Sequence, residues 1–135
     1  MSIARPDQAR NKTVAVQAEV LYLVNLMLAP GLAFLLLALL WVAHRHDADA
    51  LARQHLSQTL GVSLIGGGLI LIATLVFAAT GGLASGYLVM TLVLYFTFIH
   101  SSLILFGVIG LVKAMAGEAY TYPLVGPMIG RLFNR

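Results

Sequence analysis

The chain has 135 residues, of which 60% are hydrophobic and only 10% are charged, and its formal net charge is +3. A soluble domain of this size carries about 25% charged residues, because much of its surface stays in water. The composition therefore excludes an ordinary soluble domain and indicates an all-α integral membrane protein. The absence of cysteine excludes disulfides, thiolate metal sites and cysteine nucleophiles.

The first apolar stretch, residues 18–43, follows a polar N-terminal stretch over 1–17. A continuous helix of about 26 residues would be about 39 Å long, enough to cross a bilayer with some tilt. Pro30 and Gly31 interrupt it, and both residues favour a break. The alternatives are therefore a kinked full span and a re-entrant pair of helices. Re-entrance would place all eight Lys and Arg residues on one side. On length we predict the full span.

Residues 44–58 are the only strongly polar interior stretch, and we expect a polar loop or a surface helix there. The second predicted span covers 59–79, which is long enough to cross the hydrocarbon core. The uncharged, glycine-rich turn 80–86 then predicts a helical hairpin with a third span over 87–114. The prediction is a single membrane domain with three transmembrane helices.

The C-terminal tail, residues 115–135, mixes aromatic, aliphatic and basic residues. That composition is typical of a segment at the membrane interface, with Tyr120, Tyr122 and Phe133 as headgroup-level anchors. Five of the eight Lys and Arg residues lie beside or beyond apolar runs, which suits lipid headgroups and not nucleic acid. We expect a bacterial inner membrane, with the loop 44–58 and the tail in the cytoplasm.

The second predicted span contains small residues at a spacing typical of close helix packing in lipid. Ser57 precedes Gly61 by four residues, and Ser63 precedes Gly67 by the same number. Glycine is common in membrane helices, so chance enrichment is the alternative, but three consecutive glycines favour packing. The expected packing residues of this span are Gly61, Gly66, Gly67 and Gly68.

Few polar residues lie inside the apolar segments, and His100 is the most central of them. At 3.6 residues per turn, Thr97 and Gly107 share its helical face, which we expect to contact another helix or a partner. The alternatives for the imidazole are an interhelical hydrogen bond, a subunit contact, a haem or metal ligand, and a proton relay. Glu19 and Asn25 are interpreted as a helix-start residue and an interhelical hydrogen bond.

Haem ligation by two histidines of this chain is excluded by depth. His44, His46 and His55 all lie in the polar stretch, and His55 is about 15–20 Å from His100 along the membrane normal. The loop histidines and aspartates match no recognised metal spacing. No nucleophile with its base, carboxylate pair or phosphate-binding loop is present, so we expect neither an enzyme nor a resident cofactor.

Two stretches resemble a known family. Residues 30–65 contain an apolar helix ending near a tryptophan, a charged loop and a histidine-containing stretch, and in residues 110–126 Lys-Ala, Gly-Glu and Tyr-Pro follow the last helix. Both are similar to the Tic20-like small membrane proteins of bacteria, a domain of unknown function. The resemblance places seven residues at motif positions: His55, Gln58, Lys113, Gly117, Glu118, Tyr122 and Pro123. Protein import by chloroplast relatives would transfer to this chain by fold analogy alone.

Five of these motif residues lie on one predicted side of the membrane, where we expect a polar cluster that pins the loop to the tail: His55, Gln58, Lys113, Glu118 and Tyr122. The predicted function is that of a non-catalytic accessory or scaffold subunit, which binds other membrane proteins or its own copies in the bilayer. The alternatives are an oligomeric transport or channel component and a haem-binding electron-transfer subunit that uses His100.

Overall fold

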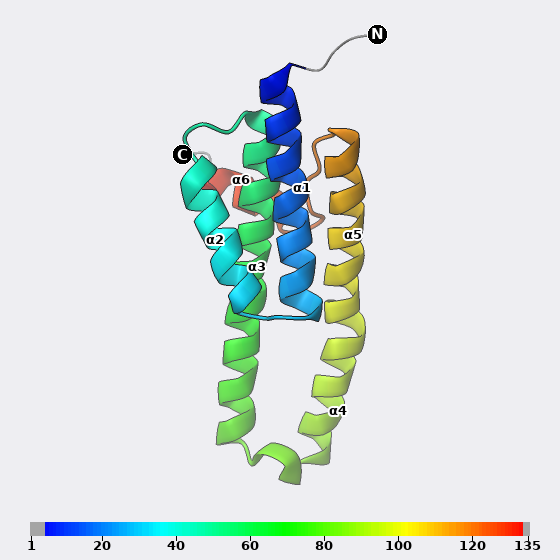
Figure 1. The fold of residues 1–135 in the computed structure, drawn as a ribbon. Coiled ribbons are helices and arrows are strands. Elements are labelled where there is room, and N and C mark those ends of the chain that lie inside the picture. Colours follow the sequence, from blue (N-terminus) through cyan, green and yellow to red (C-terminus); the bar gives the residue numbers. More distant parts are fainter. Residues whose placement is uncertain (1–4, 134–135) are drawn as a thin grey trace.

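The computed structural model describes residues 5–133, all of whose regular elements are helical (Figure 1). This confirms the all-α class. The elements are α1 (Pro6–Met27), α2 (Leu32–His44), α3 (Ala50–Ala79), the 3₁₀ turn η1 (Gly82–Ala84), α4 (Gly86–Tyr95), the π-helical turn η2 (Phe96–His100), α5 (Ser101–Ala116) and α6 (Gly126–Phe133).

Two helices of the described chain are long and apolar enough to cross a membrane. They are α3, with 30 residues, and the continuous helix Gly86–Ala116, with 31 residues. Only 11% and 6% of their most apolar windows are buried inside the protein. Soluble proteins rarely expose apolar surface on this scale, because water opposes it. The outer surface of both helices therefore suits lipid.

The first apolar stretch doubles back, so the predicted full span over 18–43 and the count of three spans are wrong. Helix α1 ends at Met27, and α2 returns beside it (Figure 1). Gly31 makes the reversal with φ +89°, which only glycine adopts readily, and its N–H donates to Asn25 Oδ1 at 3.1 Å. The 13 residues of α2 extend about 20 Å, short of a hydrocarbon core of about 30 Å.

The polar stretch 44–58 contains both forms that we expected, a non-helical connection over residues 45–49 and then the beginning of a helix. Six of its fifteen residues are exposed: Arg45, His46, Asp47, Asp49, Ala50 and Arg53. Asp49 caps α3 by accepting a hydrogen bond from the Ala52 N–H at 2.9 Å, so the helix begins at Ala50. From His55 onward the polar residues are buried, because α1 and the C-terminal tail pack against the first half of α3. The buried half of α3 carries the polar chemistry, and its exposed half is apolar.

The second half of α3 and α4 extend beyond the rest of the bundle as a two-helix hairpin (Figure 1). Gly81 and Gly82 adopt φ values of +100° and +55°, which permit the tight reversal between the two helices. The predicted span 87–114 corresponds to α4, η2 and α5, and Gly117 ends it in the left-handed conformation at φ +74°.

The basic residues gather at one end of the molecule because α1–α2 doubles back. The start of α1, the loop between α2 and α3, and the end of α5 all lie at that end (Figure 1). The turn 80–86 at the opposite end has no charge. Arg135 lies outside the described residues. The basic residues of the described chain are Arg5, Arg10, Lys12, Arg45, Arg53, Lys113 and Arg131.

Single cysteines test this topology, and the natural chain, which has none, is the blank. Gln8, Asp47 and Ala84 are exposed positions in three different parts of the fold. We expect Gln8→Cys and Asp47→Cys to react with an impermeant maleimide from the same side of sealed vesicles. Ala84→Cys should react only from the other side. If residues 18–43 formed a full span, Gln8→Cys would instead react from the same side as Ala84→Cys.

Candidate functional site

A buried polar cluster joins α1, α3 and the segment after α5. Glu19 and His55 are 0% exposed and Tyr122 is 1% exposed. His55 Nδ1 lies 2.6 Å from Glu19 Oε1, and the Tyr122 hydroxyl donates to Glu19 Oε2 at 2.6 Å. His55 Nε2 lies 2.9 Å from the backbone oxygen of Glu118. One carboxyl group therefore connects three segments that are distant in sequence.

The two partners of His55 restrict where its protons can be. A neutral imidazole has a single N–H, but here both ring nitrogens face oxygen atoms. Either His55 is doubly protonated beside an ionised Glu19, or Glu19 keeps its proton and donates it to Nδ1 while Nε2 donates to Glu118. In both arrangements every contact has one proton. In either arrangement the pair therefore holds two protons, one between His55 Nδ1 and Glu19 Oε1 and one on His55 Nε2.

Tyr122 acts in this cluster as a permanent donor. Burial raises the pKa of Tyr122 above its ordinary value, and the neighbouring Glu19 carboxyl raises it further. The phenol therefore stays protonated and keeps donating to Glu19. Its ring also packs against Tyr22, with the centroids 5.6 Å apart, and the Tyr22 hydroxyl donates to the Leu103 carbonyl at 3.2 Å.

Gln58 and Lys113 complete the attachment of the tail. Gln58 Nε2 donates to the Gly126 carbonyl at 3.1 Å, and its Oε1 accepts from the Tyr122 N–H at 3.2 Å. Lys113 Nζ lies 2.6 Å from Glu118 Oε2, with the two side chains 43% and 56% exposed. The structure thus brings together all five residues expected in the polar cluster. Lys113 and Glu118 form its exposed rim.

The expectation that Glu19 begins a helix is wrong, because α1 starts at Pro6 and Glu19 lies well inside it. Two glycines of α5 leave space for the face of α1 that carries Glu19 and Tyr22. A Cβ at Gly110 would lie 2.6 Å from Glu19 Oε2, and one at Gly107 would lie 2.7 Å from the Tyr22 ring. The sequence contained one signal for this face. Glu19 and Tyr22 are three residues apart, so a helix places the two side chains on the same side.

The C-terminal tail is part of the bundle core at two points, so Tyr122 is not the headgroup-level anchor that we expected. Besides buried Tyr122, Ile129 of α6 is 1% exposed and packs on Gly61, where a Cβ would lie 2.7 Å from it. Phe133 packs edge-on against Trp41, with the ring centroids 5.9 Å apart. Tyr120 is partly exposed.

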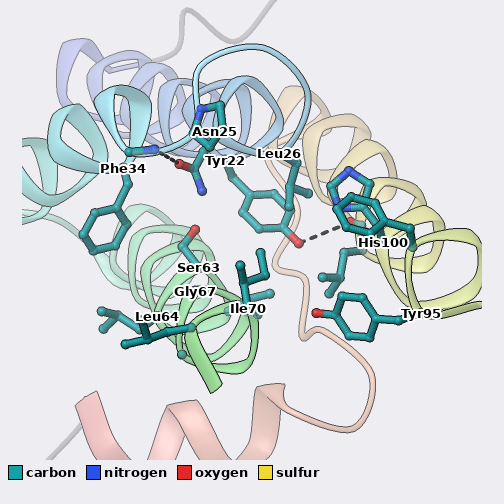
Figure 2. A pocket seen from close by; sticks show the side chains of 18 residues that line it. Tyr22, Asn25, Leu26, Phe34, Ser63, Leu64, Gly67, Ile70, Tyr95 and His100 are labelled. Atoms are coloured by element: carbon teal, nitrogen blue, oxygen red, sulfur yellow. Dashed lines mark hydrogen bonds between the residues drawn. The ribbon is translucent and has the colours of Figure 1, made fainter. Parts of the chain in front are cut away.

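A cavity of about 550 Å³ lies where the α1–α2 turn meets the middle of α3 and η2. Figure 2 shows Ser63 and Gly67 of α3 on one side and His100 on the other, with Asn25 near the turn. Ser63 is 8% exposed, and its hydroxyl has no hydrogen-bond partner among residues 5–133. No atom lies within 4 Å of a Cβ placed at Gly66, Gly67 or Gly68.

The predicted face of Thr97, His100 and Gly107 is divided in the structure. His100 is half-buried, lines the cavity and lies 5.3 Å from the Phe96 ring. Thr97 is exposed, and Gly107 is buried against α1. The π-helical turn at Phe96–His100 changes the register, since it places more residues in one turn than the 3.6 that the prediction assumed.

Comparison with known proteins identifies a different family from the one that the motifs resembled. The family model for MamF and MmsF, described as "Magnetosome magnetite crystal formation protein family", matches residues 10–129. No curated protein and no solved structure matches the chain. The match includes both stretches that resembled Tic20-like proteins, and it overturns that assignment. The chain belongs to the magnetosome magnetite crystal formation protein family.

Proposed function

We propose that this protein is a non-catalytic membrane component of magnetite crystal formation, an accessory subunit that packs against other membrane proteins or its own copies. The family match over residues 10–129 carries the proposal, since it names the process. The two long helices with exposed apolar surfaces support a place in the magnetosome membrane. The basic end of the chain then faces the cytoplasm.

The α1–α2 turn supports a role that depends on partners. Backbone outside a regular helix is tolerated at membrane depth only where protein or water covers it. In this chain Leu28, Pro30 and Gly31 of the turn are exposed. The glycines of α3 that line the adjacent cavity have no side chains, so a helix of another subunit can approach α3 closely there. Such a helix would cover the turn.

The haem alternative receives no support from the histidines in the described chain. His55 has hydrogen-bond partners at both ring nitrogens, and His44 Nδ1 lies 3.0 Å from the Leu40 carbonyl. His100 would therefore need an axial partner from another subunit. The accessory role also needs a partner subunit but no axial ligand from it, and it uses His100 as a polar group that faces the docking cavity.

Gly67→Leu tests the proposal in a magnetite-forming bacterium whose own gene is deleted. The leucine would extend into the cavity that Gly67 lines, and its Cβ meets no atom within 4 Å. We expect the deletion to change crystal number or mean diameter in electron micrographs. The natural chain should restore both, and Gly67→Leu should not, although it accumulates in the membrane.

Ala78→Leu is the matched control, since it also places a leucine side chain on the same helix, at an exposed position away from the cavity. It should restore crystals as well as the natural chain does. Unchanged crystals after deletion would contradict the role in magnetite formation. Full rescue by Gly67→Leu would leave that role intact but rule out the cavity as the docking surface.

A further inference from the structure

A second cavity, of about 570 Å³, lies at the basic end of the molecule, where α2 ends, α3 begins and α6 ends. It is separate from the polar cluster and from the cavity beside His100. The residues that shape it are Trp41, Arg45, His46, Arg53, Gln54 and Phe133.

The cavity is built to receive an anion. Among residues 5–133, its ionisable lining residues are all basic, Arg45, His46 and Arg53, and no carboxylate of this part of the chain lines it. The Arg45 guanidinium stacks 5.5 Å from the centre of the Trp41 ring, and Arg53 Nη2 donates to the Ala48 carbonyl at 3.0 Å. A guanidinium has five N–H donors, so both groups keep donors for a ligand. Phosphate is an anion that such groups recognise well.

Gln54 forms part of the cavity wall but adds no contact for the anion. Its Nε2 donates to Thr121 Oγ1 at 3.1 Å, and its Oε1, which has no hydrogen-bond partner within the described chain, is buried out of reach of a molecule in the cavity. The two arginines therefore carry the recognition of the phosphate.

The position of the cavity indicates that the phosphate belongs to a lipid. The outer face of α2 is apolar and exposed up to Leu39 and Val42, immediately before the basic residues begin. Trp41 and Phe133 form an aromatic pair at this level, as aromatic residues do at a bilayer interface. Acyl chains can therefore run along α2 while the headgroup occupies the cavity.

We propose that this cavity binds the phosphate of an anionic phospholipid. The phosphate lies between Arg45 and Arg53, and the acyl chains follow α2. This binding site stands on the cavity alone and does not depend on the proposed role in magnetite formation. It would attach the returning arm of the α1–α2 hairpin to the membrane surface.

Trp41 provides the measurement, because it is the single tryptophan of the chain and lines the cavity. The purified full chain in neutral detergent is titrated with phosphatidylglycerol that carries brominated acyl chains, which quench indole fluorescence. We expect saturable quenching, with phosphatidylcholine binding about tenfold more weakly or worse. Phosphatidylmethanol, which has the same charge but no headgroup hydroxyl, should bind as well as phosphatidylglycerol, because the arginines recognise the phosphate.

Arg45→Gln should weaken phosphatidylglycerol binding about tenfold or more, as expected when a hydrogen bond to a charged group is lost. Arg10→Gln is the matched control, an exposed arginine of α1 at the same end, and should bind as the natural chain does. Circular dichroism checks that each variant keeps its helices.

Three results would overturn the proposal. Equal quenching by phosphatidylcholine would show an unspecific apolar contact. An equal loss in Arg10→Gln and Arg45→Gln would show general attraction to the basic end of the molecule. Complete displacement of the brominated lipid by millimolar inorganic phosphate or glycerol phosphate would show that the site takes a soluble anion.

Discussion

Glu19→Ala is expected to lower the free energy of unfolding by about 3–5 kcal/mol, because it removes one partner of a buried acid–base pair. His55 Nδ1 and the Tyr122 hydroxyl, both fully covered, would lose the oxygens that lie 2.6 Å from them. Loss of the side chain also leaves a void between α1 and α5. Thermal and denaturant unfolding in detergent, followed by circular dichroism, measures the effect.

Two further variants separate the contribution of Glu19 from general charge effects. Glu118→Gln removes the carboxylate that Lys113 contacts in an exposed pair, and such pairs contribute about 0–1 kcal/mol. Glu19→Gln keeps the volume and an acceptor for Tyr122, so its loss should fall between the other two. If Glu19→Ala and Glu118→Gln lower the stability equally, the buried cluster does not hold the fold together.

The wrong topology for the first apolar stretch also hid the Glu19–His55 pair. With a full span, Glu19 and His55 would lie on opposite sides of the membrane, so no contact between them could be expected. Length alone favoured that span, whereas the direction of the chain depends on one turn with Gly31 at positive φ and an Asn25 hydrogen bond. The positions of the Lys and Arg residues favoured the correct topology, because a first stretch that doubles back places all of them on one side.

The other cluster residues were predictable because their location depends only on the later part of the chain. His55 lies near the start of one predicted span, and Lys113 and Tyr122 lie at and beyond the end of the next, so a hairpin places all three at one end. Their side-chain pairing does not follow from this topology. The partner of Tyr122 is a carboxyl group on α1, and that helix was placed incorrectly.

The family assignment failed for a related reason. The Tic20-like resemblance rested on short patterns, a charged loop after a tryptophan and a few polar residues after the last helix. Such patterns cover only two parts of the chain, and a short motif alone discriminates poorly between families. The family model that matches residues 10–129 uses nearly the whole chain, which discriminates better than two local motifs.

Gly110→Ala is expected to destabilise the protein by about 1–3 kcal/mol through overpacking between α1 and α5. The added methyl would lie 2.6 Å from Glu19 Oε2, in the middle of the buried cluster. Gly67→Ala is the matched control, because no atom lies within 4 Å of its Cβ. Alanine at this helical position should leave stability unchanged or raise it by about 0.5–1 kcal/mol.

The decisive measurement is the double variant Gly110→Ala with Glu19→Ala. Removing the carboxyl group frees the space that the methyl needs, so the two losses should not add. We expect the double variant to be more stable than the sum of the single losses predicts, by about 1 kcal/mol or more. If the two losses simply add, then the cost of Gly110→Ala comes from the backbone or from contacts with residues other than Glu19. The close approach of Glu19 to α5 would then not be what requires glycine at this position.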